Sequence, residues 1–419
     1  RNEHYRAMTR FWSKVFGLTF AIGVATGIVL EFEFGTNWEK YSRFVGDVFG
    51  SALAAEGIFA FFLESGFLAV VLFGWRRVSP RVHWFSTLMV CLGAHFSAVW
   101  IIIANSWMQT PAGHHIVVGP NGPRAEIVDF WAMVFNPSSM ERLQHTVLGA
   151  WQSGAFLLIS VGAWYLLKKR DVEFAKSSIK VGLALGVVAS LLSLQTGSES
   201  AQLVAQYQPS KLAAMEGHFP ASAPAAMYIA GWVDTDKGVT HGISVPGMLS
   251  WLISSDTSTP VTGLDAFAPE DRPPVNLVFQ PYHIMISIGM SLIGISILGI
   301  IGWWRGWLWT WKPLLWVMVF SALLPQIANQ VGWMTAEVGR QPWIVWGLLR
   351  TDAGLSTVVS VPEIVTSLVL FGFVYVLLFV LFVFMLNHKI HDGPENVRSE
   401  EYESVRRSMD AMEHKHVKA

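Results

Sequence analysis

Eight long apolar segments constrain this chain more than any other feature. Each is about 20 residues long, the length that a helix needs to cross the hydrocarbon core of a membrane. Only 14% of the 419 residues are charged, whereas soluble proteins carry about 25% charge. The sequence therefore predicts an all-α polytopic membrane protein, a bundle of about eight transmembrane helices. We expect them at Phe11–Phe32, Val48–Trp75, Trp84–Asn105, His145–Leu167, Ile179–Thr196, Pro281–Trp303, Leu308–Gly332 and Pro362–Leu386.

Basic residues are unevenly distributed among the segments that connect these helices. They gather in alternate connections, and cytoplasmic connections are the ones enriched in Lys and Arg. This pattern predicts a cytoplasmic C-terminus and a cytoplasmic N-terminal end for the sequence as given. The basic set comprises Arg6, Arg10, Arg76, Arg77, Arg81, Lys168, Lys169, Arg170, Lys176, Arg305, Lys312 and Lys389.

Three regions follow from this reading of the sequence. Residues 1–386 form the transmembrane domain, and within it 197–280 form a long extracytoplasmic loop rich in Pro, Gly, Ala and Ser. Loops of that length are usually functional or disordered. Residues 387–419 form a charged cytoplasmic tail that we expect to be partly helical. No internal repeat is evident, which disfavours a transporter built from inverted repeats.

Composition excludes several classes of site and partner. Cys91 is the only cysteine, so a disulfide framework, a Cys-rich zinc site, an iron–sulfur cluster and a covalently attached c-type haem are all excluded. The formal net charge is −1, and nothing in it suggests a nucleic-acid partner.

Two carboxylates lie inside the second predicted span. Glu56 and Glu64 are eight residues apart, which in a regular α-helix is an advance of about 12 Å and a turn of about 80° beyond two full turns. Both can share one broad face. Because intramembrane carboxylates usually mark a cavity, a cofactor or a proton route, we interpret the pair as functional rather than structural.

Two residues at helix starts could together ligate a haem iron. His145 and Met285 each begin a helix that starts outside, and an imidazole and a thioether can close a low-spin haem from opposite faces. Both residues also have ordinary structural readings, as a hydrogen-bonded histidine and a packing methionine. His283 is an alternative to Met285, and the spacing of the residues leaves that choice open.

Further polar residues lie toward the same side of the membrane. Glu337 and Arg340 could pair with each other, or could ligate a haem iron and pair with a haem propionate. Lys211 and Glu216 read by themselves as an ordinary amphipathic turn. In this topology these groups, with Glu56, His145 and Met285, fall in the outer third of the membrane or beyond it, and only Glu64 lies deeper.

Taken together, these residues resemble those of subunit I of the cytochrome bd family of bacterial quinol oxidases. The resemblance covers nearly the whole chain except the charged tail. Its most specific parts are the block around Glu56 and Glu64 and the motif that ends at Trp343. The matching segments are Phe34-Gly35-Thr36-Asn37-Trp38, Gly46-Asp47, Glu56-Gly57, Phe61-Phe62-Leu63-Glu64-Ser65, Ala104-Asn105-Ser106-Trp107-Met108-Gln109, His145-Thr146-Val147, Lys211-Leu212-Ala213-Ala214-Met215-Glu216 and Gly339-Arg340-Gln341-Pro342-Trp343.

The resemblance implies a role for each matching position. His145 and Met285 match the axial ligands of a low-spin haem b, and Glu337 matches a ligand of a high-spin haem at the oxygen site. Glu56 matches a glutamate beside the pair of high-spin haems. Glu64 and Ser97 match positions linked to proton delivery. Lys211 and Glu216 match residues of the quinol-binding loop, which is called the Q-loop. Arg340 and Trp343 match residues of the haem-associated motif.

The family's activity then becomes the expectation for this chain. Quinol would be oxidised at the outer face, and electrons would pass through the low-spin haem b to a high-spin haem b and a haem d, or a further haem b. Oxygen would be reduced to water, generating a proton motive force without a pump. The implied partners are a second large subunit, a small single-helix subunit, quinol, oxygen and membrane lipid, in the bacterial inner membrane.

One departure from the family pattern leaves two other hypotheses open. Family members have nine helices in this subunit, and the first carries a haem-ligating histidine, whereas this sequence begins before the second. We expect a truncated sequence. If that helix is absent, a haem b cytochrome that delivers quinol electrons to another acceptor is the alternative. A non-redox proton channel or transporter using Glu56 and Glu64 is the second.

Overall fold

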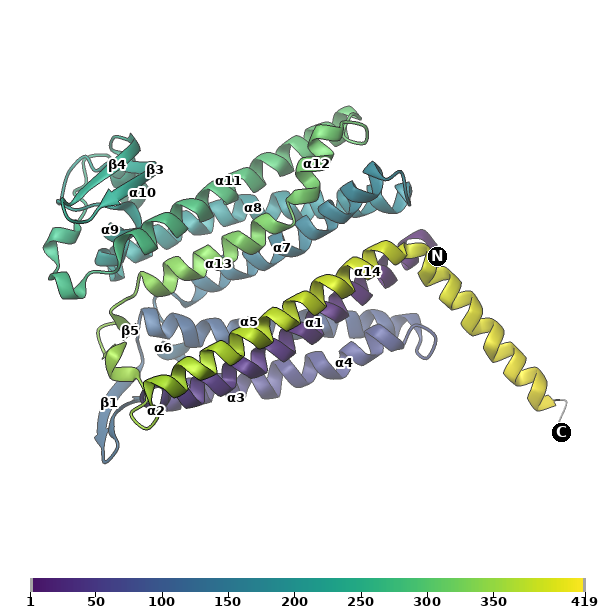
Figure 1. Ribbon diagram of the computed structural model, residues 1–419, viewed down its shortest axis with the longest axis horizontal. Coiled ribbons are helices and arrows are strands. Elements are labelled where there is room, and N and C mark those ends of the chain that lie inside the picture. Colours follow the sequence, from purple (N-terminus) through teal and green to yellow (C-terminus); the bar gives the residue numbers. More distant parts are fainter. Residues whose placement is uncertain (1–2, 417–419) are drawn as a thin grey trace.

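The computed structural model describes residues 3–416, except for the side chains of Glu31, Phe59 and residues 395–416. Helices dominate it, and short strands occur only in the connections at one end (Figure 1). The longer helices are α1 (Glu3–Asn37), α3 (Gly46–Glu56), α4 (Phe62–Phe73), α5 (Pro80–Gln109), α7 (Ser139–Leu167), α8 (Val172–Tyr207), α11 (Val275–Arg305), α12 (Lys312–Phe320), α13 (Leu323–Val338) and α14 (Val361–His416). The shorter ones are α2 (Glu39–Phe44), α6 (Phe130–Val134), α9 (Pro209–Glu216) and α10 (Met248–Ser254).

The predicted fold class is confirmed. Within residues 3–416, 7 helical segments are long and apolar enough to cross a membrane, with α12 and α13 counted together as Lys312–Val338. The predicted span Val48–Trp75 is built differently. It consists of α3, a π-helical segment at Gly57–Phe61 and α4 in direct succession, and the junction residues keep helical backbone angles.

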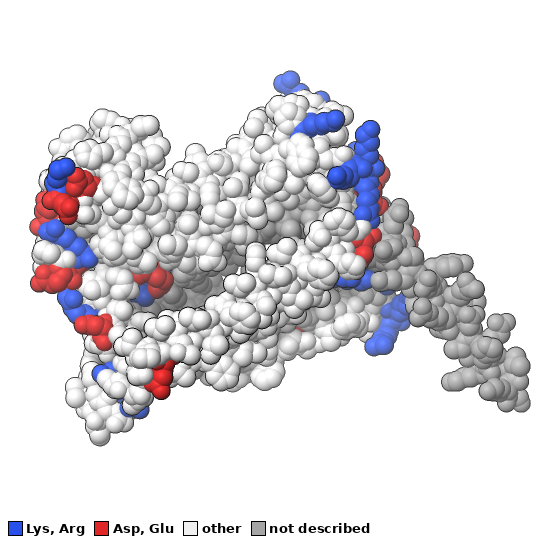
Figure 2. Space-filling model, viewed as in Figure 1, with Lys and Arg blue, Asp and Glu red and all other residues white. Residues whose placement is uncertain are grey.

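The spans form two groups that are visible in Figure 1. In one, α7 packs along α8, and α11 packs against both α8 and α13. In the other, α1 packs along α14, and α5 packs against α3 and α4. The groups meet where α5 packs against α7 and where the first turns of α1 pack against α7 and α8. Figure 2 shows a hollow in this face between the groups, with acidic and basic side chains at one end of it.

Charged side chains gather at the two ends of the bundle, and a belt without them lies between (Figure 2). The end that holds the N-terminus is mostly basic, whereas the opposite end mixes both signs. Helix α14 shows the belt most clearly, because none of the residues in its most apolar window is buried inside the chain. Such a helix fits a lipid-facing or subunit-facing position.

Three antiparallel hairpins lie at the end with mixed charge (Figure 1). They pair β1 (His114–Gly119) with β2 (Gly122–Ile127), β3 (Met227–Asp234) with β4 (Val239–Val245), and β5 (Trp343–Val345) with β6 (Leu349–Arg350).

The long loop is shorter and more ordered than the sequence suggests. Helix α8 continues to Tyr207, because Ser200 donates to Glu141 and Gln195 to Glu199, and these bonds support turns made of small polar residues. Residues 208–274 then contain α9, the β3–β4 hairpin and α10. The tail is helical as far as His416, with one break at Gly393, where φ is +72°.

Candidate functional site

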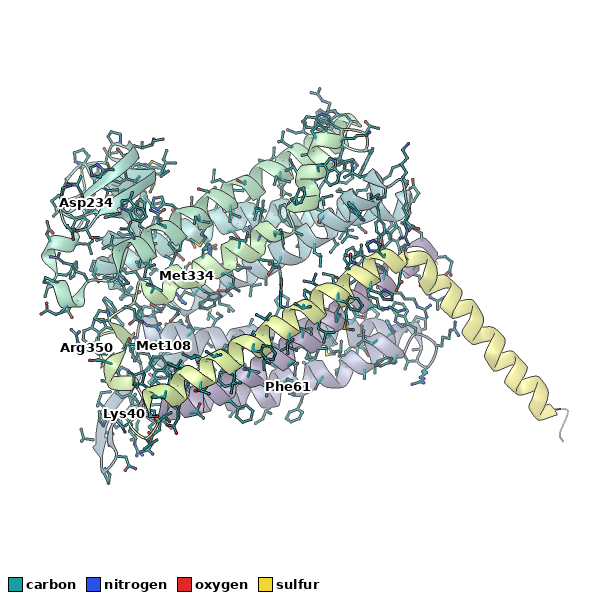
Figure 3. The ribbon with its side chains drawn as sticks, in the orientation of Figure 1. Lys40, Phe61, Met108, Asp234, Met334 and Arg350 are labelled. Carbon is teal, nitrogen blue, oxygen red and sulfur yellow. The ribbon has the colours of Figure 1, made fainter. Side chains whose placement is uncertain are left out.

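Glu337 is the centre of a buried polar network at the C-terminal end of α13. Arg340 donates to its Oε2. Asn105 on α5 donates to its Oε1 at 3.1 Å, and Gln109 does so at 3.4 Å. Figure 3 labels Met334, which is three residues before Glu337 on α13, and Met108, which is three residues after Asn105 on α5. Glu337 and Arg340, which the sequence predicts either to pair with each other or to serve a haem, therefore form a pair.

Part of Glu337 remains open despite these bonds. Its side chain is 33% exposed, while that of Arg340 is 3% exposed. A carboxylate keeps lone pairs beyond those used by its donors, so Glu337 can still ligate a metal.

Arg142 belongs to this network, although our sequence reasoning missed it. It donates to the side-chain oxygen Oδ1 of Asn105, whose amide nitrogen in turn donates to Glu337. Its guanidinium lies over the Trp333 ring, 5.9 Å from the centroid. The signal in the sequence was its place one helical turn before His145, on the same side of α7.

Lys211, on α9, connects the long loop after α8 to the Glu337 network. Its ammonium, which is buried, donates to Gln109 Oε1 at 3.1 Å, Gln208 Oε1 at 3.2 Å and the Ala336 carbonyl oxygen at 2.9 Å. These three bonds use all three donors of an ammonium. Desolvation, assisted by Arg142 and then Arg340, holds the pKa of Lys211 well below its usual value.

Glu216 has the opposite surroundings. It is fully buried, and neither carboxylate oxygen has a hydrogen-bond partner among the described residues. Burial raises its pKa to about 7, and interaction with the Tyr282 hydroxyl partly offsets this rise. The inner face of the β3–β4 hairpin covers this region, because Thr240 donates to the carbonyl oxygen of Gly217. A carboxyl in such a site can exchange a proton near neutral pH.

His145 is held in one tautomer. Thr196 on α8 donates its hydroxyl hydrogen to the carbonyl oxygen of Leu192 at 3.1 Å, so toward the imidazole its oxygen acts as an acceptor. His145 Nδ1 lies 2.9 Å from that oxygen and is therefore the protonated nitrogen. Nε2 keeps its lone pair, which is the form that binds iron.

Met285 and His283 differ in what their side chains already contact. His283 uses both ring nitrogens, one with the carbonyl oxygen of Phe279 and one with that of Tyr228, each at 2.8 Å. Met285 has no such bonds. Its sulfur lies against α13 at Gly332, where an added Cβ would be only 2.9 Å away from it. This contrast favours Met285 as the available ligand.

The two candidate ligands flank the same stretch of α13. Asn329 lies one turn before Gly332 and donates to the carbonyl oxygen of Gly149, which is one turn after His145 on α7. Met285 approaches that stretch from α11. The surroundings therefore fit a haem held by a histidine and a methionine.

Glu56 and Glu64 lie in the other helix group. Ser97 on α5 donates to Glu56 at 2.6 Å, so this serine pairs with Glu56. Glu64 is 8% exposed and packs on Gly93, where an added Cβ would come within 2.9 Å of the Glu64 Cβ. Because a π-helical turn accommodates one extra residue, the two glutamates behave like residues seven apart, about 20° from alignment.

Trp343 begins β5 beyond the Glu337 network. Its carbonyl oxygen accepts from Arg340 Nε at 3.2 Å, and its ring lies under Arg350, 4.9 Å from the centroid. Within the motif, Trp343 therefore supports Arg340 through its backbone carbonyl oxygen.

The fold and site together define a multi-pass membrane protein with carboxylate, imidazole, thioether and arginine groups buried between its helices. The family model for "Cytochrome bd terminal oxidase subunit I" matches residues 1–394. The chain belongs to this family, whose members are quinol:oxygen oxidoreductases.

Individual relatives agree with this assignment. The chain is 38% identical to cytochrome bd ubiquinol oxidase subunit 1 of Bacillus subtilis, covering 94% of this chain and 86% of the relative. It is 34% identical to cytochrome bd-II ubiquinol oxidase subunit 1 of Escherichia coli, with 95% and 90% covered. The solved structure of bd oxidase from Geobacillus thermodenitrificans matches with a TM-score of 0.85 and 29% identity, over 94% of this chain and 89% of that one.

Proposed function

We propose that this chain oxidises quinol at the end that carries the Q-loop and delivers the electrons to an oxygen-reducing centre between its helices. The membrane is the bacterial cytoplasmic membrane, with that end outside. His145 and Met285 would hold a low-spin haem b, and Glu56 and Glu337 would serve a high-spin haem b and a haem d, or a further haem b. When bound, these haems supply the electron transfer and the oxygen reduction.

One observation carries the proposal. Met285 packs against the apolar cluster that contains Ala213, Ala214, Met215 and Tyr282, which is also the cluster around Glu216. The candidate base for quinol and the candidate ligand of the low-spin haem therefore share one wall. Lys211, in the same helix as Glu216, bonds to the backbone just before Glu337. The Q-loop is thus in direct contact with two of the ligand-bearing helices, α11 and α13.

The protein side of quinol oxidation falls to Glu216. As the carboxylate it accepts a proton from a quinol hydroxyl, and its pKa of about 7 suits transfer in both directions near neutral pH. Lys211 acts differently, since its three donors are occupied. It holds α9 against α5 and α13.

Protons for water would come from the basic end of the bundle. Glu64 lies nearer that end than Glu56 and interacts with it electrostatically. Ser97 holds the Glu56 carboxylate from α5. The aligned pair gives a proton two successive carboxylate positions on one helix face, which is the usual arrangement of an intramembrane relay.

Partner subunits follow from the family and from the exposed helix α14. The curated relatives are named subunit 1, so other subunits exist in their complexes. We propose a second large subunit and a small single-helix subunit here, with lipid covering the rest of the charge-free belt.

Optical spectroscopy of Met285→Leu tests the ligand assignment. Leucine keeps the bulk and removes the sulfur, so the low-spin bands in the reduced-minus-oxidised spectrum are expected to be lost. Met290→Leu is the matched control, since Met290 lies on the same helix and is 52% exposed. Low-spin bands that survive unchanged in Met285→Leu would show that another residue ligates the iron.

A further inference from the structure

Two arginines in the Glu337 network have buried donors without acceptors. Arg142 Nε and Arg340 Nη1 are buried, and neither has a hydrogen-bond partner among the described residues. Such groups are rare in native proteins, because a buried donor left unpaired destabilises the folded state, and more so when it is charged. Each of the two donors therefore indicates an acceptor that the protein chain does not itself supply.

The charges of the network point the same way. Arg142 and Arg340 face one carboxylate, Glu337, and Lys211 lies within electrostatic reach of all three. The neighbouring acid Glu141, which accepts from Ser200, adds a second carboxylate that interacts with Arg142, and the three basic side chains still outnumber the two acidic ones. A buried surplus of positive charge is stable only when anions pair with it. Arginine is also the side chain best suited to bind a carboxylate.

Arg142 lies between the two candidate iron sites. It is three residues before His145 on α7, and its charge acts on that imidazole. Through Asn105 it is also two hydrogen bonds away from Glu337. A group bound to Arg142 would therefore be close to the ligands of both the low-spin and the high-spin haem.

We propose that Arg142 binds a carboxylate side group of the haem ligated by His145. This assignment rests on the proposed function. It gives a role to a residue that carries no motif, and it makes the Arg142–Asn105–Glu337 chain a direct polar link between the low-spin site and the oxygen site.

The test is infrared redox difference spectroscopy of protein whose haem carboxylates carry ¹³C. In Arg142→Gln, the labelled carboxylate band shifts relative to the parent, and the midpoint potential of the low-spin haem becomes more negative because a nearby positive charge is gone. Arg142→Lys keeps the charge and loses the guanidinium, so its band shifts while its potential stays near the parent value. Arg350→Gln, which removes an outer arginine paired with Asp271, leaves both unchanged.

Two results would overturn the assignment. One is a labelled band and a potential in Arg142→Gln that match those of Arg350→Gln. The other is an Arg142-sensitive band that does not move with the label, because its carboxylate would then belong to the protein. Either result leaves the proposed function standing if the low-spin bands persist. A parent protein without haem would overturn the proposed function as well.

Discussion

Single side chains decide the chemistry of this site through the partners that hold them. Thr196 is the clearest case, because its hydroxyl determines which nitrogen of His145 carries the proton. Thr196→Val keeps the shape and removes the acceptor. We expect weaker haem retention, by about 10-fold to 100-fold as for other residues that orient metal ligands, and an altered low-spin spectrum.

Thr196→Ser is the matched control, since serine keeps the hydroxyl, and it should restore the parental spectrum and haem content. A valine variant with an unchanged spectrum would show that His145 does not depend on Thr196 for its tautomer.

Glu216 sets a pH dependence at the same scale. Its folded-state pKa of about 7 means that the basic form appears as the pH rises through 7. Quinol oxidation needs that form, so kcat/KM for quinol should rise from pH 6 to pH 8 and then level off. Glu216→Gln should lower kcat/KM by about 100-fold or more and flatten this rise. Retention of the rise in the glutamine variant would assign it to another group.

Individual residues also show which parts of the site could be predicted from the sequence. Glu56 and Glu64 stood out because carboxylates are rare in apolar spans, and Glu337 because an arginine follows it three residues later beyond the end of a span. The structure buries Glu64, pairs Glu56 with Ser97 and places Glu337 in a polar network. Arg142 and Thr196 could not be found in that way. An arginine near a helix start and a threonine within a helix are common, and their meaning comes from contacts between α5, α7, α8 and α13.

At the scale of elements, the π-helical turn at Gly57–Phe61 is the main departure from the expected helices. A regular helix predicts the two glutamates about 80° apart, whereas the π turn nearly aligns them. Apolar periodicity cannot reveal one extra residue in a helix that is apolar around most of its surface. The extension of α8 to Tyr207 was missed for a related reason, since its last turns are polar.

Close helix packing makes a second prediction at this scale. Helix α8 approaches α7 at Gly182, where an added Cβ would lie 2.7 Å from the carbonyl oxygen of Ala155. Gly182→Ala should therefore destabilise the protein by about 1–3 kcal/mol, measured as a lower thermal midpoint in detergent. Gly154→Ala on α7 meets nothing within 4 Å and should leave the midpoint unchanged. Equal midpoints for the two variants would contradict this account of the helix contact.

At the scale of the whole molecule, the proposed orientation places the Q-loop outside the cell. Cys91 is the only cysteine, so Cys91→Ser gives a background for labelling. In that background Lys237→Cys, in the β3–β4 turn, should react with a membrane-impermeant maleimide on intact cells. Lys312→Cys, at the basic end, should react only after the cells are opened. The reverse pattern would invert the topology and move the quinol site to the cytoplasmic face.

The central claim is that this chain holds a haem relay fed by quinol. It is tested most directly by adding quinol, without oxygen, to the protein purified with its partner subunits and recording the optical spectrum. The account predicts that low-spin b bands appear together with high-spin b or d bands, and that all of them reoxidise when oxygen is admitted. A featureless spectrum would contradict the account. Low-spin bands that oxygen does not reoxidise would contradict its oxygen-reducing part.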